Sequence, residues 1–197
     1  LENNMYELAY YTIPLYNTST YASADEDQTS EMLDLVQDAV DQTNAYAASL
    51  TGLSDSDFSS ALLGYFSSVV TSALPEVYAV LGSTYSSDSN APSLELIGDS
   101  TVTSAFTAEG AADTIRGLSI GQAAALKYNG YAMMAVLRLD PLSLNSLDNL
   151  RGQVLNDMKG EELSEALTAY GASLEHNLSS SAMNRMPASK IVNSSTN

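Results

Sequence analysis

The chain lacks the residues on which several kinds of chemistry depend. Its 197 residues include no cysteine and no tryptophan, and its one histidine is His176. Without cysteine, disulfide bonds and thiolate catalysis are excluded. One histidine among scattered carboxylates does not supply the ligands of a zinc site, so we interpret His176 as a surface residue near the end of a helix. We expect no metal and no other cofactor.

Sequence motifs of catalytic and phosphate-binding sites are also scarce. An EF-hand loop that started at Asp25 would need glycine and glutamate where Ser30 and Val36 stand. Gly117 and Gly121 lack the lysine and the preceding strand of a phosphate-binding loop. A Ser-His-Asp triad forms only in space, so that alternative stays open. On these grounds we expect the protein not to be an enzyme.

Basic residues are missing from more than half of the chain. All seven lie at or after Arg116, so residues 1–115 hold 17 acidic residues and no basic one, and the formal net charge is −17. Such a surface excludes nucleic acid as a partner and repels anionic membranes, so we expect membrane contact only indirectly. The charge fits a solvated, self-repelling face, a high-salt environment, a cationic partner or a pH switch.

Tyrosine takes the place of the missing tryptophan. The chain has 12 tyrosines and 3 phenylalanines, and five of the tyrosines fall in residues 1–28, a tyrosine-rich N-terminal segment. Tyrosine combines a large contact area with a polar tip, which suits interfaces. We therefore expect this segment either at an interface or packed on its own domain.

Helical periodicity dominates residues 29–82, which we predict to be an acidic helical part. Residues 29–51 carry apolar side chains at alternating spacings of three and four, and residues 56–73 carry a wide apolar stripe. We expect the second helix to end before Pro75, because the residue that precedes a proline is pushed out of the helical region. A short helix should then begin at Pro75.

Residues 83–115 are rich in Ser, Thr, Asp and Asn, and we expect a long polar connection there. Within it, residues 93–97 fit either a short strand or a loop, and residues 103–107 fit a helical turn. A span this long without secondary structure indicates either a functional loop or an error in the prediction.

The longest apolar run, residues 117–139, is predicted to be the central helix of the molecule. Gly117, Gly121 and Ala125 recur at every fourth position, which would leave a flat stripe where another helix packs closely. Polar residues such as Lys127 interrupt the run, so we do not expect it to span a membrane.

The C-terminal portion completes the predicted fold. Residues 116–178 form a charge-neutral helical part with further helices at 143–158 and 161–178, and residues 179–197 form a polar tail. The predicted fold class is therefore all-α, a bundle of about five amphipathic helices with a long polar connection in the middle.

Residues Asp38–Asn44 read D-A-V-D-Q-T-N. They resemble the opening signature of the R-body structural proteins, the Reb or killing trait family, which is close to D-A-V-T-Q-T-N and differs at Asp41. Residues 61–74 and the Q-A-A run at 122–124 are similar to later segments of that family, in the same order. The chain departs from the family in residues 83–115, which would be an insertion, and in the extensions at both ends.

The resemblance implies a self-assembling structural subunit, a homo-oligomer or polymer in the bacterial cytoplasm. R-bodies are protein ribbons, rolled into a cylinder, that extend when acidified and break membranes. Carboxylates without basic neighbours repel one another in a packed lattice, and protonation would relieve that repulsion. The candidate residues for this pH switch are Asp34, Asp38 and Asp41.

Two other functions stay open. Long amphipathic helices and a polar connection also fit an extracytoplasmic helical-bundle domain that binds a ligand as a sensor. Richness in Ser, Thr and Ala fits a secreted acidic protein that coats a surface. A sensor would be flanked by transmembrane helices in the full-length protein, whereas a ribbon subunit would polymerise.

Overall fold

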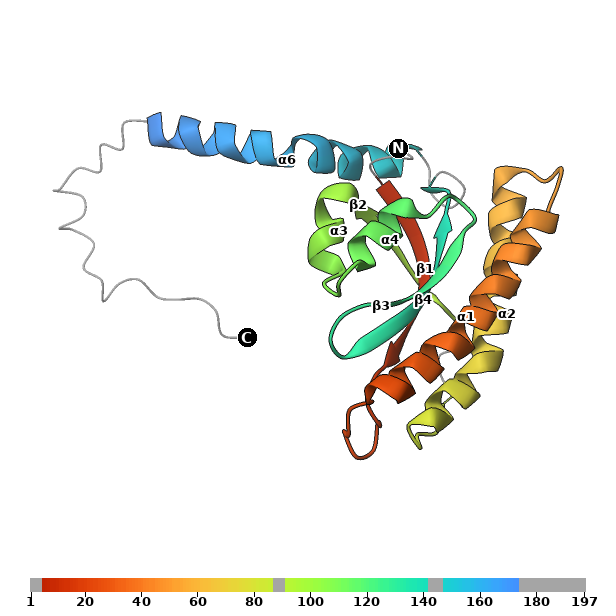
Figure 1. Cartoon of the computed structure of the whole chain (residues 1–197). Coiled ribbons are helices and arrows are strands. Elements are labelled where there is room, and N and C mark those ends of the chain that lie inside the picture. Colours follow the sequence, from red (N-terminus) through yellow and green to blue (C-terminus); the bar gives the residue numbers. More distant parts are fainter. Residues whose placement is uncertain (1–4, 87–90, 142–146, 174–197) are drawn as a thin grey trace, which may run out of the picture. The chain divides into compact units, whose positions relative to one another are not determined.

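The computed structural model of the chain describes residues 5–86, 91–141 and 147–173. Contacts divide the chain into two compact units, residues 1–158 and 159–197. The first unit contains a four-stranded antiparallel sheet with helices on both of its faces (Figure 1). The prediction of an all-α helical bundle is therefore wrong, and the fold is mixed α and β.

The first strand of the chain lies inside the sheet. β1 (Met5–Pro14) pairs with β2 (Ser93–Gly98) on one side and with β4 (Ala132–Leu139) on the other, and β3 (Ala123–Lys127) pairs with β4. The strand order is β2-β1-β4-β3. Because pairing with β2 stops at Tyr10, the last part of β1 pairs with β4 alone.

One face of the sheet is covered by a pair of long helices. These are α1 (Glu26–Ser49) and α2 (Asp55–Val80), which run antiparallel to each other (Figure 1). Ala9, Tyr11 and Ile13 of β1 are buried in the core beneath them. These three positions alternate along the strand, so their side chains point to the same face.

The opposite face carries two short helices, α3 (Asp99–Ala105) and α4 (Ala111–Gly117) (Figure 1). Tyr6 and Leu8 of β1 are buried in this second core. Since successive side chains of a strand point to opposite faces, β1 contributes to both cores.

Residues 117–139, predicted as the central helix, contain a β-hairpin instead. β3 and β4 are joined around Asn129-Gly130, and the Asn129 side chain accepts a hydrogen bond of 2.8 Å from the Tyr131 amide. Every residue of β4 is buried. A strand buried on both faces is apolar at each position, so its sequence has no period that separates it from a buried helix.

The three small residues predicted to form a helix-packing stripe do not share a helix. Gly117 ends α4, Gly121 lies in the turn before β3, and Ala125 lies within β3. Gly121 still permits a close approach, because its φ is +82° and a Cβ there would stand 2.9 Å from the ring of Phe58 in α2. Both the backbone and the available space therefore require glycine at this position.

The two long helices predicted in residues 29–82 are present, with different ends. α1 begins earlier than predicted, because Asp25 and Gln28 form a capping box in front of it. α2 continues through Pro75, so the predicted break there is wrong. Leu74 and Val77 are buried on either side of the exposed Pro75, and their packing outweighs the one hydrogen bond that proline removes.

The described part of residues 83–115 holds more secondary structure than its polar composition predicts. β2 confirms the strand alternative for residues 93–97, and α3 and α4 follow it. Val102 and Ile115, both fully buried, anchor these short helices in the core. A few buried apolar side chains are enough to hold these short helices in the fold, because each one stabilises the fold by about 1.5–3 kcal/mol when buried.

α6 (Leu147–Ser173) is one helix where two were predicted. In the second unit, residues 161–170 of this helix are exposed. No helix in the described ranges is long and apolar enough to cross a membrane. The predicted continuation of the last helix to residue 178, the surface position of His176 and the polar tail at 179–197 lie outside the described residues.

Candidate functional site

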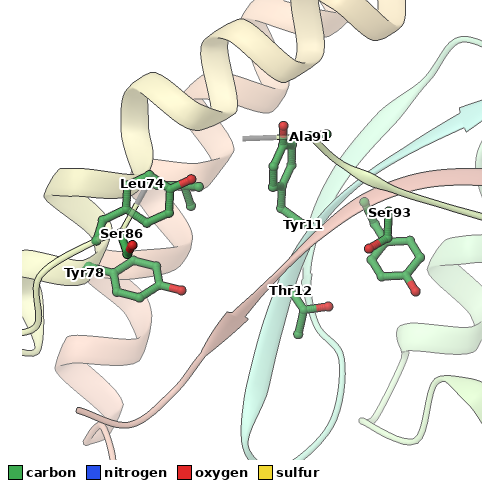
Figure 2. Close-up of a pocket in the computed structure, with 9 residues that line it drawn as sticks. Tyr11, Thr12, Leu74, Tyr78, Ser86, Ala91 and Ser93 are labelled. Carbon is green, nitrogen blue, oxygen red and sulfur yellow. The ribbon is translucent and has the colours of Figure 1, made fainter. Parts of the chain in front are cut away.

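A cavity of about 280 Å³ lies where β2 stops pairing with β1. Its walls come from β1, from α2 and from the two ends of the segment that joins α2 to β2 (Figure 2). Among the described residues, no lining side chain is acidic or basic, and hydroxyl groups dominate. The lining residues are Tyr10, Tyr11, Thr12, Leu74, Tyr78, Tyr85, Ser86, Ala91 and Ser93.

Three successive residues of β1 form one wall of this tyrosine pocket. Tyr10 and Tyr11 point to opposite faces of the sheet, so the pocket wraps around the edge of β1 between them. Figure 2 shows Tyr11 directed from the strand toward Ala91, and Thr12 on the other side of the strand. Thr12 stands beyond the last residue of β1 that pairs with β2.

Tyr11 is the most deeply buried tyrosine of the pocket. Its side chain is almost fully buried, its hydroxyl shares a hydrogen bond of 2.8 Å with Ser67 of α2, and its ring centre lies 5.9 Å from that of Phe66. Burial raises the pKa of Tyr11, the bond to Ser67 lowers it, and the nearby Tyr85 raises it. At neutral pH the side chain is therefore a neutral hydroxyl in a fixed position.

Tyr78 and Tyr85 form the opposite wall. Tyr78 lies on the turn of α2 that follows Pro75, and the ring centres of the two tyrosines are 5.4 Å apart. Burial raises the pKa of Tyr78, and so does the neighbouring Tyr85. Tyr11, Tyr78 and Tyr85 all line the same cavity. In Figure 2 the Tyr78 hydroxyl points from α2 into the space in front of β1.

Tyr10 connects the pocket to a carboxylate of β2. Its hydroxyl donates a hydrogen bond of 2.9 Å to Glu95 of β2. Burial, followed by this bond and the charge of Glu95, raises the pKa of Tyr10 to about 12. Tyr10 therefore stays protonated at neutral pH and holds the Glu95 carboxylate through this hydrogen bond.

The pocket offers aromatic faces and neutral hydroxyls. Phenols whose pKa lies above the usual value of 10 donate and accept hydrogen bonds at neutral pH but do not act as bases. The described part of the lining holds no basic side chain for an anion, so the chemistry favours a neutral or cationic ligand. Tyr10 and Tyr11 belong to the predicted tyrosine-rich segment, whereas Tyr78 and Tyr85 were not singled out by any sequence pattern.

A charged cluster on the other side of the sheet ties α3 and α4 to β1. The buried Arg138 places its guanidinium 4.6 Å from the ring centre of Tyr6 and donates a hydrogen bond to the carbonyl of Leu118. The Tyr6 hydroxyl donates to Asp99, and Arg116 forms an ion pair of 3.0 Å with the same carboxylate. These contacts join helices to strands, and we assign the cluster a structural role.

The predicted pH-switch residues lie apart from the tyrosine pocket. Asp34, Asp38 and Asp41 are exposed on α1. Asp41 accepts a hydrogen bond of 2.7 Å from Gln37, and Asp38 lines a separate groove between α1 and α2. Their role in a pH switch stays a prediction.

Residues 117–121 spell G-L-S-I-G, the G-x-S-x-G pattern of a hydrolase nucleophile. In a nucleophile elbow the serine lies between a strand and the helix that follows it. Here Ser119 lies between the end of α4 and the start of β3, which is the reverse order, and its amide donates to the Gln122 side chain. The pattern therefore does not form an elbow.

The segment that resembles the R-body signature has clear packing roles. Ala39, Val40 and Thr43 are buried against the sheet. Asn44 extends from α1 to the edge of β3, where its side chain accepts a hydrogen bond of 2.8 Å from the Ala123 amide and donates one of 3.2 Å to the Ala123 carbonyl. Packing within this fold explains these residue types without reference to assembly.

Comparisons add no assignment to this geometry. No protein-family model matches the chain, and no curated protein or solved structure matches it with significance. Within the described residues, no group of three or more histidine, aspartate or glutamate side chains is placed to hold a metal ion. The functional argument therefore rests on the tyrosine pocket and on the charge of the chain.

Proposed function

We propose that the protein is a ligand-binding module whose tyrosine pocket takes a small organic ammonium cation. The observation that carries this proposal is the convergence of Tyr11, Tyr78 and Tyr85 on one cavity of about 280 Å³. This volume is near the lower end for ligand sites, so the ligand is small.

A positive charge on the ligand follows from the groups around the pocket. The face of an aromatic ring attracts a cation through its quadrupole, by about 0.5–2 kcal/mol for each ring. The Glu95 carboxylate lies next to the pocket, held by Tyr10. Residues 1–115, which supply every lining residue, contain 17 acidic residues and no basic one, so the surrounding potential is negative.

The affinity expected from these contacts is modest. Three aromatic contacts of about 1–1.5 kcal/mol each sum to roughly 4 kcal/mol. Because association also costs translational and rotational freedom, these contacts alone support a dissociation constant of about 1 mM at the tightest. A ligand that also uses the hydroxyls and the Glu95 carboxylate would bind more tightly.

Choline and its uncharged carbon analogue, 3,3-dimethylbutan-1-ol, test the proposal directly. We expect isothermal titration calorimetry to detect binding of choline in the millimolar range, and at least about 5-fold weaker binding of the alcohol. Equal affinity for the two compounds, or no binding of either, would reject an ammonium site.

Matched tyrosine variants locate the binding. Tyr78→Leu removes a ring and a hydroxyl from the pocket, whereas Tyr131→Leu makes the same change at an exposed side chain outside the lining. We expect Tyr78→Leu to weaken choline binding about 5- to 10-fold. Tyr131→Leu should leave the affinity unchanged, and a similar loss in both variants would place the ligand elsewhere.

We keep self-assembly into a homo-oligomer or filament as a second proposal, because α6 carries exposed apolar side chains on one face. Leu163, Leu167 and Tyr170 follow the three- and four-residue spacing of a helix face and are 60%, 61% and 64% exposed. An exposed apolar stripe of this kind favours association. If the assembly also extends on acidification, Asp34, Asp38 and Asp41 of α1 are the candidate switch residues.

Light scattering coupled to size-exclusion chromatography tests assembly, with negative-stain imaging at pH 7 and pH 5. Leu163→Glu combined with Leu167→Glu should prevent association. Ser164→Glu combined with Thr168→Glu adds the same charge beside the stripe and should not. A monomer at both pH values would reject self-assembly.

If the protein assembles, an unchanged transition pH in a variant with all three switch aspartates replaced by asparagine would reject the pH switch. Those aspartates are Asp34, Asp38 and Asp41.

A further inference from the structure

A second hollow lies between the two long helices, separate from the tyrosine pocket. It has a volume of about 330 Å³, and its lining comes from α1 and α2 alone. Apolar side chains form its floor, and two carboxylates stand among its polar lining residues. The floor consists of Leu35, Ala39, Val69 and Ala73, and the carboxylates are Asp38 and Glu76.

Small side chains explain why the groove exists. Ala39 on α1 and Ala73 on α2 both contribute to it, and an alanine leaves space between two helices that a longer side chain would fill. Leu35 and Val69 are only partly buried, so apolar surface remains accessible at the floor. Apolar surface of this kind gains free energy when a partner covers it.

The charged side chains of the two helices that form the groove are all acidic. Asp38 and Glu76 are exposed, and the two helices with their connection, residues 26–80, contain nine acidic residues and no basic one. The ion pairs found among the described residues lie elsewhere, in the α3–α4 region and in α6. A partner that brings lysine or arginine would therefore meet carboxylates that have no cation beside them in this pair of helices.

The groove follows about two turns of each helix, from Leu35 to Gln42 on α1 and from Val69 to Glu76 on α2. Tyr46 lies eleven residues after Leu35 on α1, which is about 16 Å along a helix. Its ring stacks on that of Tyr65 of α2, with ring centres 4.1 Å apart and planes 15° apart. Tyr65 lies one turn of α2 from Val69, so this aromatic pair lies one turn beyond the lining of the groove.

We infer that the groove between α1 and α2 docks a basic amphipathic helix of a partner protein. Apolar side chains of that helix cover the alanine floor, and its lysine or arginine side chains lie against Asp38 and Glu76. Recognition of a helix in a groove by an apolar stripe with flanking charges is a common mode of peptide binding. This site is independent of the tyrosine pocket, and it gives Asp38 a role in recognition.

Fluorescence anisotropy with two labelled model peptides tests the inference on the full chain. One is a 14-residue amphipathic peptide of leucine and lysine with an apolar stripe, and the other has the same composition scrambled so that no stripe forms. We expect the amphipathic peptide to bind at least 5-fold more tightly at 150 mM NaCl, because only its stripe covers the floor. Equal binding of the two peptides would reduce the effect to general attraction by an acidic surface and overturn the inference.

Matched charge variants separate the groove from the rest of the acidic surface. Asp38→Asn with Glu76→Gln removes two charges at the groove, and Asp34→Asn with Asp41→Asn removes two exposed charges of α1 outside its lining. We expect the first pair to weaken the amphipathic peptide about 5-fold and the second pair less than 2-fold. Equal losses would overturn the inference.

Amide chemical shifts give a measurement that does not depend on any variant. On addition of the amphipathic peptide, the ¹H–¹⁵N resonances that move should belong to residues of the groove, above all Ala39 and Ala73. If the largest shifts belong to the sheet or to α6, the docking surface is not this groove, and the inference is overturned.

Discussion

Replacing Gly121 with alanine should destabilise the first unit by about 2–5 kcal/mol, for two separate reasons. Its φ of +82° lies in the left-handed region, where a residue with a Cβ costs about 1–2 kcal/mol. The new Cβ would also stand 2.9 Å from two ring carbons of Phe58, and relief of such overpacking costs about 1–3 kcal/mol.

Urea unfolding followed by circular dichroism measures this change, and Gly64→Ala is the matched control. Gly64 lies inside α2 with nothing near its missing Cβ, so the same substitution should stabilise the protein by about 0.5–1 kcal/mol. In a double variant, Phe58→Leu should recover the steric part of the Gly121→Ala effect and leave the backbone part of about 1–2 kcal/mol. If Gly121→Ala is neutral, or if both glycine variants change stability in the same direction, the proposed close approach is wrong.

Three further predictions concern the helices and the tyrosines. Asn44→Ala should lower the free energy of unfolding in urea by about 1–3 kcal/mol, because it leaves the backbone amide and carbonyl of Ala123 without the Asn44 side chain as a partner. An unchanged free energy of unfolding would show that water replaces the side chain. Pro75→Ala should raise the stability of α2 by about 1–3 kcal/mol, because alanine restores a helical hydrogen bond, and a lower melting temperature would contradict this. The pKa of Tyr10 is raised to about 12, so its protonated hydroxyl contributes to the stability of the folded state fully below pH 10, and this contribution is lost as the pH rises from 10 to 12. Tyr10→Phe should therefore make the free energy of unfolding depend less on pH in this range. Identical pH dependences in the variant and the original protein would contradict this prediction.

The parts of the fold that the sequence predicts well are those whose signals are local. α1 follows from apolar positions spaced three and four apart, a period that few other structures produce. Residues 117–139 were misassigned because β4 is buried on both faces and so carries no alternation. Asn129-Gly130, a typical hairpin turn, was the local signal for the correct structure.

The candidate site depends on pairing that no local pattern encodes. Tyr10 and Tyr11 stand out by composition, but the pocket exists because β2 stops pairing at Tyr10, a register that is set across the whole sheet. Tyr78 reaches the pocket only because α2 continues through Pro75. The proline rule predicts a break there, and tertiary packing of Leu74 and Val77 overrides it.

The position of β1 inside the sheet also has a consequence for biosynthesis. The ribosome makes this strand before both of its neighbours, which are residues 93–98 and 132–139. At roughly 5–20 residues per second, β1 waits about 6–24 seconds for β4 to be made. The helical hairpin of α1 and α2 needs only local contacts and can form during that interval. Until translation passes residue 139, the nascent chain therefore carries an apolar strand with at least one open edge, which exposes it to pairing with other chains.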